Sequence, residues 1–281
     1  MMSWPPESQH TLQQELTTIA HHAPGHWSFA VRESGTQIAG VDPRRIATPA
    51  STIKVAVLVL VLQEVAANRL RLEDEIPVPD DRVGGSGVLV VLPSVQRLTV
   101  AEIAELMIVV SDNEATNILI RLLGLDHIAN RLPELGMTAT RIERTLMDTH
   151  LPGRNQTTAH DQAVLLDRLC ADLLPDRLRT FALDMLLRQQ FNSRMPARLG
   201  PDVLCRHKTG EIIGVRHDVG ILEFDDRKIA FAALGTDLQD AIDAQGPGPV
   251  DDVVARATAA VVTAARSQPA EPTPDQGGAR P

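Results

Sequence analysis

The stretch Ser51–Leu62, STIKVAVLVLVL, places one serine and one lysine at the start of an otherwise apolar run. The run has no polar face, which is typical of a helix buried on all sides. Helical residues three positions apart are neighbours, so we expect the Lys54 ammonium beside the Ser51 hydroxyl. Burial lowers the pKa of a lysine, and a neutral amine can accept the serine proton. Taken alone, the stretch also fits a helix start capped by Ser51 or Thr52, with Lys54 extending to water.

The segments on both sides of this run differ in type. Segments 26–34 and 36–42 flank Gly35 like two strands of a hairpin, after a helix-like stretch near residues 7–22. From residue 52 to about residue 190, apolar residues recur at helical spacing. Strand-like runs then occupy 202–210, 214–224 and 228–237, and a helix pattern closes at 249–266.

This order predicts an α+β fold in which the two ends of the chain build one antiparallel sheet flanked by helices. We expect a discontinuous α/β lobe from residues 7–50 and 195–266, and an all-α lobe from residues 51–194. A groove between two lobes is a common ligand site. The remaining residues, 267–281, are rich in Pro and Gly and are predicted to be disordered.

Composition narrows the partners. The chain has 281 residues, 43% of them hydrophobic, and a formal net charge of -9 with no block of Lys or Arg. This argues against nucleic acid or an anionic membrane as partner, so we expect a monomer that binds a small molecule. The histidines and two cysteines lack metal-ligand spacing, so neither a metal nor another cofactor is expected. Without a visible secretory signal, the chain is expected in the cytoplasm, or in the periplasm or medium if it is a trimmed mature form.

Two further motifs accompany the serine and lysine. Ser111–Asn113, SDN, follows an apolar helix pattern, and His207–Gly210, HKTG, ends a strand-like run. S-x-x-K, S-D-N and K-T-G in this order are the signature of class A β-lactamases and penicillin-binding proteins. Over residues 7–266 the chain resembles this family of penicillin-recognising serine hydrolases. The resemblance implies an α/β lobe beside an all-α lobe, with the active site in the groove between them.

The resemblance also implies catalytic roles. Ser51 attacks a carbonyl and forms an acyl-enzyme, and Lys54 takes or relays its proton. Ser111 passes a proton to the leaving nitrogen, and Lys208 supplies positive charge near Ser111 and a substrate carboxylate. Backbone N–H groups of Ser51 and Glu211 form the oxyanion hole.

Substrate-binding roles follow from the same likeness. Asn113 hydrogen-bonds a substrate amide, Thr209 offers its hydroxyl to the substrate carboxylate, and Gly210 lets the substrate lie against the strand. Arg216 or the neighbouring His217 could bind an anionic group; a charge on the strand surface is the alternative. Asp112 is expected to brace its turn.

One position departs from the family. Efficient class A β-lactamases carry a glutamate that activates water for deacylation, and in the aligned stretch 141–166 Leu146 stands in its place. Asp148 is the nearest carboxylate and the candidate deacylation base, although it is shorter and displaced by two residues; Glu143 lies on the other side. Without that base the acyl-enzyme is expected to be long-lived, or its natural acyl group to leave by another route.

Three functions remain open. The first is hydrolysis of β-lactams, with a role in antibiotic resistance, in which Asp148 or a Lys54-bound water serves deacylation. The second is a related serine hydrolase: an esterase, an amidase or a D-alanyl peptidase. The third is a protein that binds β-lactams or peptides in the groove without turnover.

Overall fold

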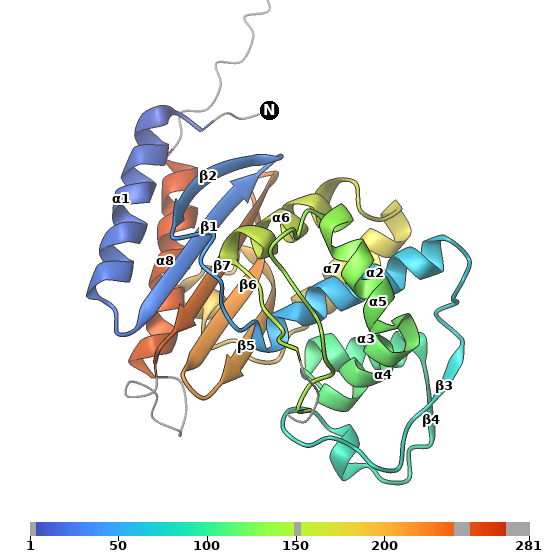
Figure 1. Cartoon of the computed structure of the whole chain (residues 1–281). Coiled ribbons are helices and arrows are strands. Elements are labelled where there is room, and N and C mark those ends of the chain that lie inside the picture. Colours follow the sequence, from blue (N-terminus) through green and yellow to red (C-terminus); the bar gives the residue numbers. More distant parts are fainter. Residues whose placement is uncertain (1–3, 149–152, 239–247, 268–281) are drawn as a thin grey trace, which may run out of the picture.

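A five-stranded antiparallel sheet with helices on both faces forms one side of the molecule (Figure 1). This computed structural model describes residues 4–148, 153–238 and 248–267. The strand order is β2 (Thr36–Val41), β1 (His26–Glu33), β7 (Arg227–Thr236), β6 (Val215–Phe224), β5 (Leu204–Ile212). Strands from the two ends of the chain thus pair directly, as β1 does with β7. The predicted α+β class is confirmed.

Helices are the main regular elements between β2 and β5. They are α2 (Ile53–Ala66), α3 (Val100–Val109), α4 (Asn113–Leu123), α5 (Leu125–Arg131), α6 (Ala159–Ala171) and α7 (Asp176–Leu187). Short 3-10 turns lie at Ala50–Thr52, Leu89–Val91, Leu132–Leu135 and Met195–Arg198. A small ribbon pairs β3 (Glu75–Pro77) with β4 (Arg97–Thr99).

Two hairpin turns set the register of the sheet. Ser34 and Gly35 have φ values of 50° and 84° between β1 and β2, and Asp225 and Asp226 have φ values of 47° and 60° between β6 and β7. Two central residues with positive φ match the twist of antiparallel strands, and Gly and Asp tolerate this conformation.

Alternation along the strands gives the sheet two apolar faces. Phe29 and Phe231 face a cluster that includes residues of α1 (Pro6–His22) and α8 (Pro249–Arg266). Ala30 and Ala232 belong to the other cluster, which includes α2 and α6. The helices at the two ends of the chain therefore cover one face, and the middle of the chain covers the other (Figure 1).

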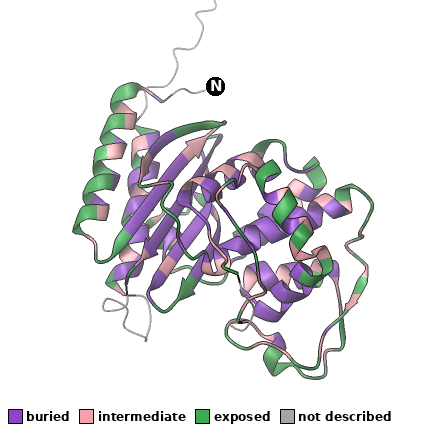
Figure 2. Ribbon diagram, in the orientation of Figure 1, coloured by how far each residue is buried: buried purple, intermediate pink, exposed green. Residues whose placement is uncertain are grey.

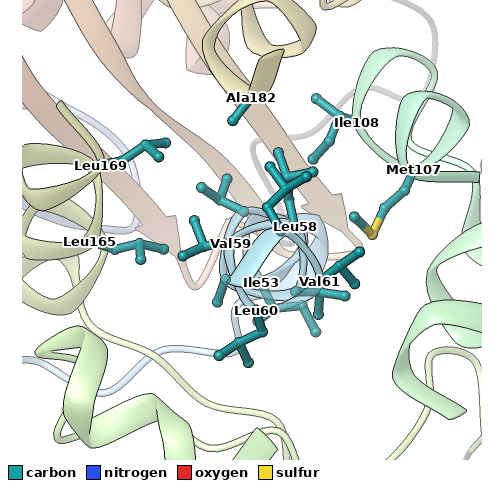
Figure 3. Packing of buried hydrophobic residues seen from close by; sticks show 14 of the residues in the cluster. Ile53, Leu58, Val59, Leu60, Val61, Met107, Ile108, Leu165, Leu169 and Ala182 are labelled. Atoms are coloured by element: carbon teal, nitrogen blue, oxygen red, sulfur yellow. The ribbon is translucent and has the colours of Figure 1, made fainter. Parts of the chain in front are cut away.

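Helix α2 is the centre of the second cluster. Every residue from Ile53 to Leu62 is buried, Lys54 included, as Figure 2 shows along this helix. Side chains from other helices surround it, among them Leu165 of α6, Met107 of α3 and Ala182 of α7 (Figure 3). The all-round apolar pattern of STIKVAVLVLVL thus reflects burial on all sides.

The division into lobes at residues 50 and 195 stays a prediction. The predicted disordered tail lies, apart from Ser267, outside the described residues. Within the described ranges, no helix is both long and apolar enough to cross a membrane.

Candidate active site

The nucleophile turn lies where the sheet meets α2. Ser51 is the middle residue of the Ala50–Thr52 turn, which continues directly into α2. Ala50 has a φ of 47°, an uncommon value for a residue with a side chain. Thr52 donates from its backbone N–H and its hydroxyl to the Pro49 carbonyl, at 3.1 and 2.7 Å. Ser51 is half-buried and lines a cavity of about 980 Å³.

A buried histidine supports this turn from β6. His217 Nε2 donates to the Thr48 carbonyl at 2.8 Å, and its Nδ1 accepts from the Gly235 N–H at 3.2 Å. These two roles require the neutral ring. Burial lowers the pKa of His217 to about 4, so the ring stays neutral at physiological pH.

The SDN motif forms a strained, braced turn before α4. Ser111 has a φ of 57° and is buried. One carboxylate oxygen of Asp112 caps α4 by accepting from Ala115 N–H, and the other accepts from Val88 N–H and Leu89 N–H at 2.7 and 2.8 Å. Asp112 therefore braces the turn, and Ser111 and Asn113 are free to face the cavity, which both line.

Lys54 connects this turn to the nucleophile helix. Its Nζ contacts the Ser111 carbonyl at 2.7 Å, Ser111 Oγ at 3.0 Å and Asn113 Oδ1 at 3.0 Å. Within the described residues, Ser51 Oγ is not among its hydrogen-bond partners. Spacing alone predicted the Lys54 amine beside Ser51, whereas its hydrogen bonds go to Ser111 and Asn113.

The environment of Lys54 favours its neutral form. Burial, and secondarily the charge of Lys208, hold the pKa of Lys54 well below its ordinary value, against an opposite effect of Asp112. Two of its three contacts are to oxygens that can only accept, whereas the hydroxyl of Ser111 can donate or accept. A neutral Lys54 can therefore keep two N–H bonds and accept a proton from Ser111.

The KTG motif lies on β5 beside the nucleophile turn. Lys208 is buried behind the cavity surface, and its Nζ donates to the Thr209 carbonyl at 2.9 Å. Burial lowers the pKa of Lys208 to about 7, Asp218 and Glu211 act in the opposite sense, and Arg194 lowers it further. Thr209 and Glu211 line the cavity.

Gly210 makes a close contact possible. A Cβ at this position would lie 3.1 Å from the Pro49 carbonyl oxygen and 3.2 Å from Ser51 N. The missing side chain thus makes room for the nucleophile turn itself. Strand β5 can therefore approach Ser51, as a shared oxyanion hole requires.

The sequence comparison agrees with this geometry. A model of the beta-lactamase enzyme family matches residues 11–264. The chain belongs to the beta-lactamase enzyme family. This family and fold are those of serine β-lactamase-type hydrolases, as the motifs predicted. No curated protein matches the chain.

Solved structures of this family share the whole architecture. PBP-A is 27% identical with a TM-score of 0.79, covering 92% of this chain and 97% of PBP-A. A β-lactamase from Sphaerobacter thermophilus is 25% identical with a TM-score of 0.81, covering 96% and 99%. An ancestral class A β-lactamase is 26% identical with a TM-score of 0.81, covering 90% and 99%.

Leu146 lies at the cavity of this family member. It lines the cavity, and its backbone N–H and carbonyl pair with Oδ1 and Nδ2 of Asn117 at 2.7 and 3.0 Å. Glu143 is exposed, and its carboxylate accepts from Arg154 N–H in the same loop. Among the described residues that line the cavity, neither Asp148 nor Glu143 occurs. Asp148 as deacylation base stays a prediction.

Arg216 is not among the residues that line the cavity, although it lies opposite Glu211 in the register of β5 and β6. Its Nε is 3.8 Å from Asp251 Oδ1, and its guanidinium also donates to the Val215 carbonyl. Its predicted role in binding an anionic group remains untested. No cluster of three or more His, Cys, Asp or Glu side chains in the described ranges could hold a metal ion.

Sequence reasoning missed two residues of this site. Asn117 holds the loop at Leu146, and Arg194, also buried, forms an ion pair with Glu211. Asn117 is four residues after Asn113 on α4, so a second asparagine on the same helix face was an available signal. Arg194 precedes β5 by ten residues, and nothing in its local sequence indicates burial.

Proposed function

We propose that this chain is a serine hydrolase in which Ser51 forms an acyl-enzyme with β-lactams and related amides and esters, and that the acyl group then leaves slowly. One observation carries the proposal. Lys54 and Ser111 form a hydrogen-bonded proton path next to the Ser51 cavity, whereas Leu146 contributes no proton acceptor to it.

Acylation uses side chains at and behind the cavity surface. Ser51 Oγ attacks the carbonyl carbon while its proton passes to the neutral amine of Lys54. The carbon–nitrogen bond then breaks, and Ser111 gives its hydroxyl proton to the leaving nitrogen and takes one from Lys54. The backbone N–H groups of Ser51 and Glu211 stabilise the oxyanion; removing one such donor costs about 3–4 kcal/mol in known hydrolases.

Deacylation lacks an evident general base. A water must attack the ester carbonyl, and a positioned base accelerates such a step about 10²–10⁴-fold. The aliphatic side chain of Leu146 cannot accept a proton. One similar structure is a PBP-A variant with glutamate in place of a leucine, solved as an acyl-enzyme complex with penicillin G; it is 26% identical, with a TM-score of 0.79. We therefore expect weak β-lactam turnover.

Intact-mass spectrometry tests the proposal directly. The protein is mixed with penicillin G and sampled from seconds to hours, with Ser51→Ala as control. We expect a mass increase of one penicillin that persists for many minutes and is absent in the variant. An adduct that clears within seconds would contradict slow deacylation, and the absence of any adduct would overturn β-lactam recognition.

A second candidate is hydrolysis of esters or amides with apolar groups. Four exposed apolar side chains line the cavity: Ile46, Met147, Phe191 and Ile212. Such side chains favour an apolar acyl group over water. Turnover of small acyl esters that depends on Ser51, without turnover of penicillins, would favour this function.

A further inference from the structure

Two arginines of the loop that carries Leu146 line the cavity. The two limbs of this loop run antiparallel, since Arg141 and Gln156 exchange both backbone hydrogen bonds at 2.9 Å. This pairing places Arg144 and Arg154 on adjacent limbs, and both residues line the cavity together with Leu146. Two guanidinium groups therefore come to the cavity from one loop.

The contacts within the loop leave both of these charges without a partner. Arg144 donates from its backbone N–H to Asn155 Oδ1 at 3.2 Å, and its carbonyl accepts from Asn155 Nδ2 at 3.1 Å. Arg154 donates from its backbone N–H to Glu143 Oε2 at 2.7 Å. The hydrogen bonds and ion pairs of the described residues include none from either guanidinium group. The residue that joins the limbs is thus a neutral amide, and the two charges stay available.

The charge balance of the cavity favours an anionic ligand. Glu211 is the carboxylate among the described lining residues, and it is already paired with the buried Arg194. Glu143 and Asp148 belong to the same loop as the two arginines, but neither is among those lining residues. The chain as a whole carries a formal net charge of -9. The lining therefore offers two uncompensated positive charges on an otherwise acidic protein.

The position of the loop indicates which end of a substrate meets these charges. A Cβ on Gly85 would lie 2.7 Å from Asn113 Nδ2 and 3.7 Å from Met147 Sδ, so the loop comes close to Asn113. The family resemblance assigns Asn113 to a substrate amide and Thr209 on β5 to the carboxylate of the leaving side. A substituent on the acyl side of the scissile bond would therefore extend from Asn113 toward the loop.

We propose that Arg144 and Arg154 form an anion subsite for the acyl side of the substrate, so that donors with a carboxylate there acylate Ser51 faster than neutral ones. This inference rests on the proposed Ser51 chemistry and names its substrate class. The planar guanidinium group presents paired N–H donors that match a carboxylate, and the attraction between opposite charges speeds association.

Two penicillins that differ by one charge test the inference. Their side chains are 5-carboxypentanoyl, which is anionic, and 5-carbamoylpentanoyl, which has nearly the same shape and is neutral. Both share one nucleus and one leaving nitrogen. Timed intact-mass spectra at several concentrations give the second-order rate constant for acylation of Ser51. In the unaltered protein we expect the ratio of the anionic to the neutral rate constant to be about ten.

Substitutions of the two arginines should reduce this ratio. Arg144→Gln and Arg154→Gln are each expected to lower it about threefold, and the double variant should bring it close to one, because each change removes one positive charge. Arg144→Lys keeps the charge and should hold the ratio within about twofold of the unaltered value. Because only the ratio is compared, differences in the intrinsic reactivity of the variants cancel.

A matched control removes the same charge elsewhere. Arg177 is an exposed arginine of α7 and does not line the cavity. Arg177→Gln changes the net charge equally and is expected to leave the ratio unchanged. Raising the salt from about 0.05 to 1 M should lower the ratio in the unaltered protein, since salt screens exposed charges, and should not change it in the double variant.

The outcomes separate this inference from the function beneath it. A ratio near one in the unaltered protein overturns the inference, as does a high ratio that persists in the double variant or an equal fall in Arg177→Gln. Acylation by the neutral penicillin tests the proposed function by itself. If neither penicillin forms an adduct, that function fails. Calorimetric binding to Ser51→Ala then decides the inference, and equal affinities for the two penicillins would overturn it.

Discussion

Lys54 is fully buried one helical turn after Ser51, and its hydrogen bonds go to Ser111 and Asn113. In water a lysine would be charged and a poor base, but burial lowers the pKa of Lys54, so that its neutral amine can accept a proton. The S-x-x-K spacing predicted its link to Ser51. Its hydrogen bond to Ser111 depends on the path of the chain between residues 54 and 111, which spacing does not encode.

Replacing Leu146 with glutamate should place a general base at the cavity. Because Leu146 lines the same cavity as Ser51, a carboxylate there can activate a water, and we expect penicilloyl clearance at least about tenfold faster. Timed intact-mass spectra measure this rate. Leu146→Gln has nearly the same shape and no base, so it should give no increase; equal acceleration by both variants would contradict the explanation.

The two buried lysines can be titrated individually. The chain has three lysines, Lys54, Lys208 and Lys228, and Lys228 is partly exposed. Selective labelling of lysine side chains for NMR therefore yields three signals with a built-in exposed reference. We expect the signal of Lys208 to change near pH 7; a transition near the ordinary lysine value, about 10.4, would contradict burial as its cause.

The same pKa shift predicts a pH dependence of stability. Between about pH 7 and 10 the unfolded chain binds a proton at residue 208 that the folded chain lacks, so the free energy of unfolding rises with pH. Lys208 alone contributes up to about 1.4 kcal/mol per pH unit. Urea unfolding at pH 7 and 9 measures this slope. Lys208→Met should reduce it, and an unchanged slope would refute the assignment.

At the scale of elements, periodicity predicted most of the structure. The apolar run after Ser51 forms the buried helix α2. The three strand-like patterns near the C-terminal end form β5, β6 and β7. The ion pair between Arg194 and Glu211 could not be predicted in this way. It depends on how the turn before β5 lies against the strand, which is a tertiary contact without a local signal.

Helix α2 should be sensitive to any loss of volume. Leu58 is fully buried among the helices around α2, so Leu58→Ala is expected to lower the free energy of unfolding by about 2–5 kcal/mol. Denaturant unfolding measures the change. Ile213, which is 90% exposed, provides the comparison: Ile213→Ala should change stability by less than about 0.5 kcal/mol. Similar losses in both variants would contradict the packing argument.

At the scale of the whole molecule, Arg227 joins parts from both ends of the chain. Its guanidinium pairs with Glu33 of β1 at 2.5 Å, donates to the Ala265 carbonyl of α8 at 2.8 Å and lies over the Trp4 ring at 4.8 Å. The sequence indicated that the two ends share a sheet. It gave no sign of which side chain would join them.

Arg227→Met should therefore destabilise the entire fold. The change leaves the Glu33 carboxylate buried without its cation, which costs about 3–5 kcal/mol in buried pairs. Arg266 is a matched control, because its ion pairs with Asp202 and Asp225 are exposed; Arg266→Met should cost less than about 1 kcal/mol. Thermal and denaturant unfolding measure the loss of stability in both variants. Equal losses of unfolding free energy would contradict the role of Arg227 in joining the two ends of the chain.

Because β1 pairs with β7, the parts of the active site are synthesised at different times. Ser51 leaves the ribosome well before Lys208 and Glu211, which complete its surroundings from β5. At translation rates of about 5–20 residues per second, this interval lasts roughly 10 to 30 s. For that time the nascent chain carries a serine with no second oxyanion donor and no closed sheet behind it. The growing polypeptide is therefore not expected to react at Ser51. Reactivity is expected only after β5 and the strands that pair with it have been synthesised.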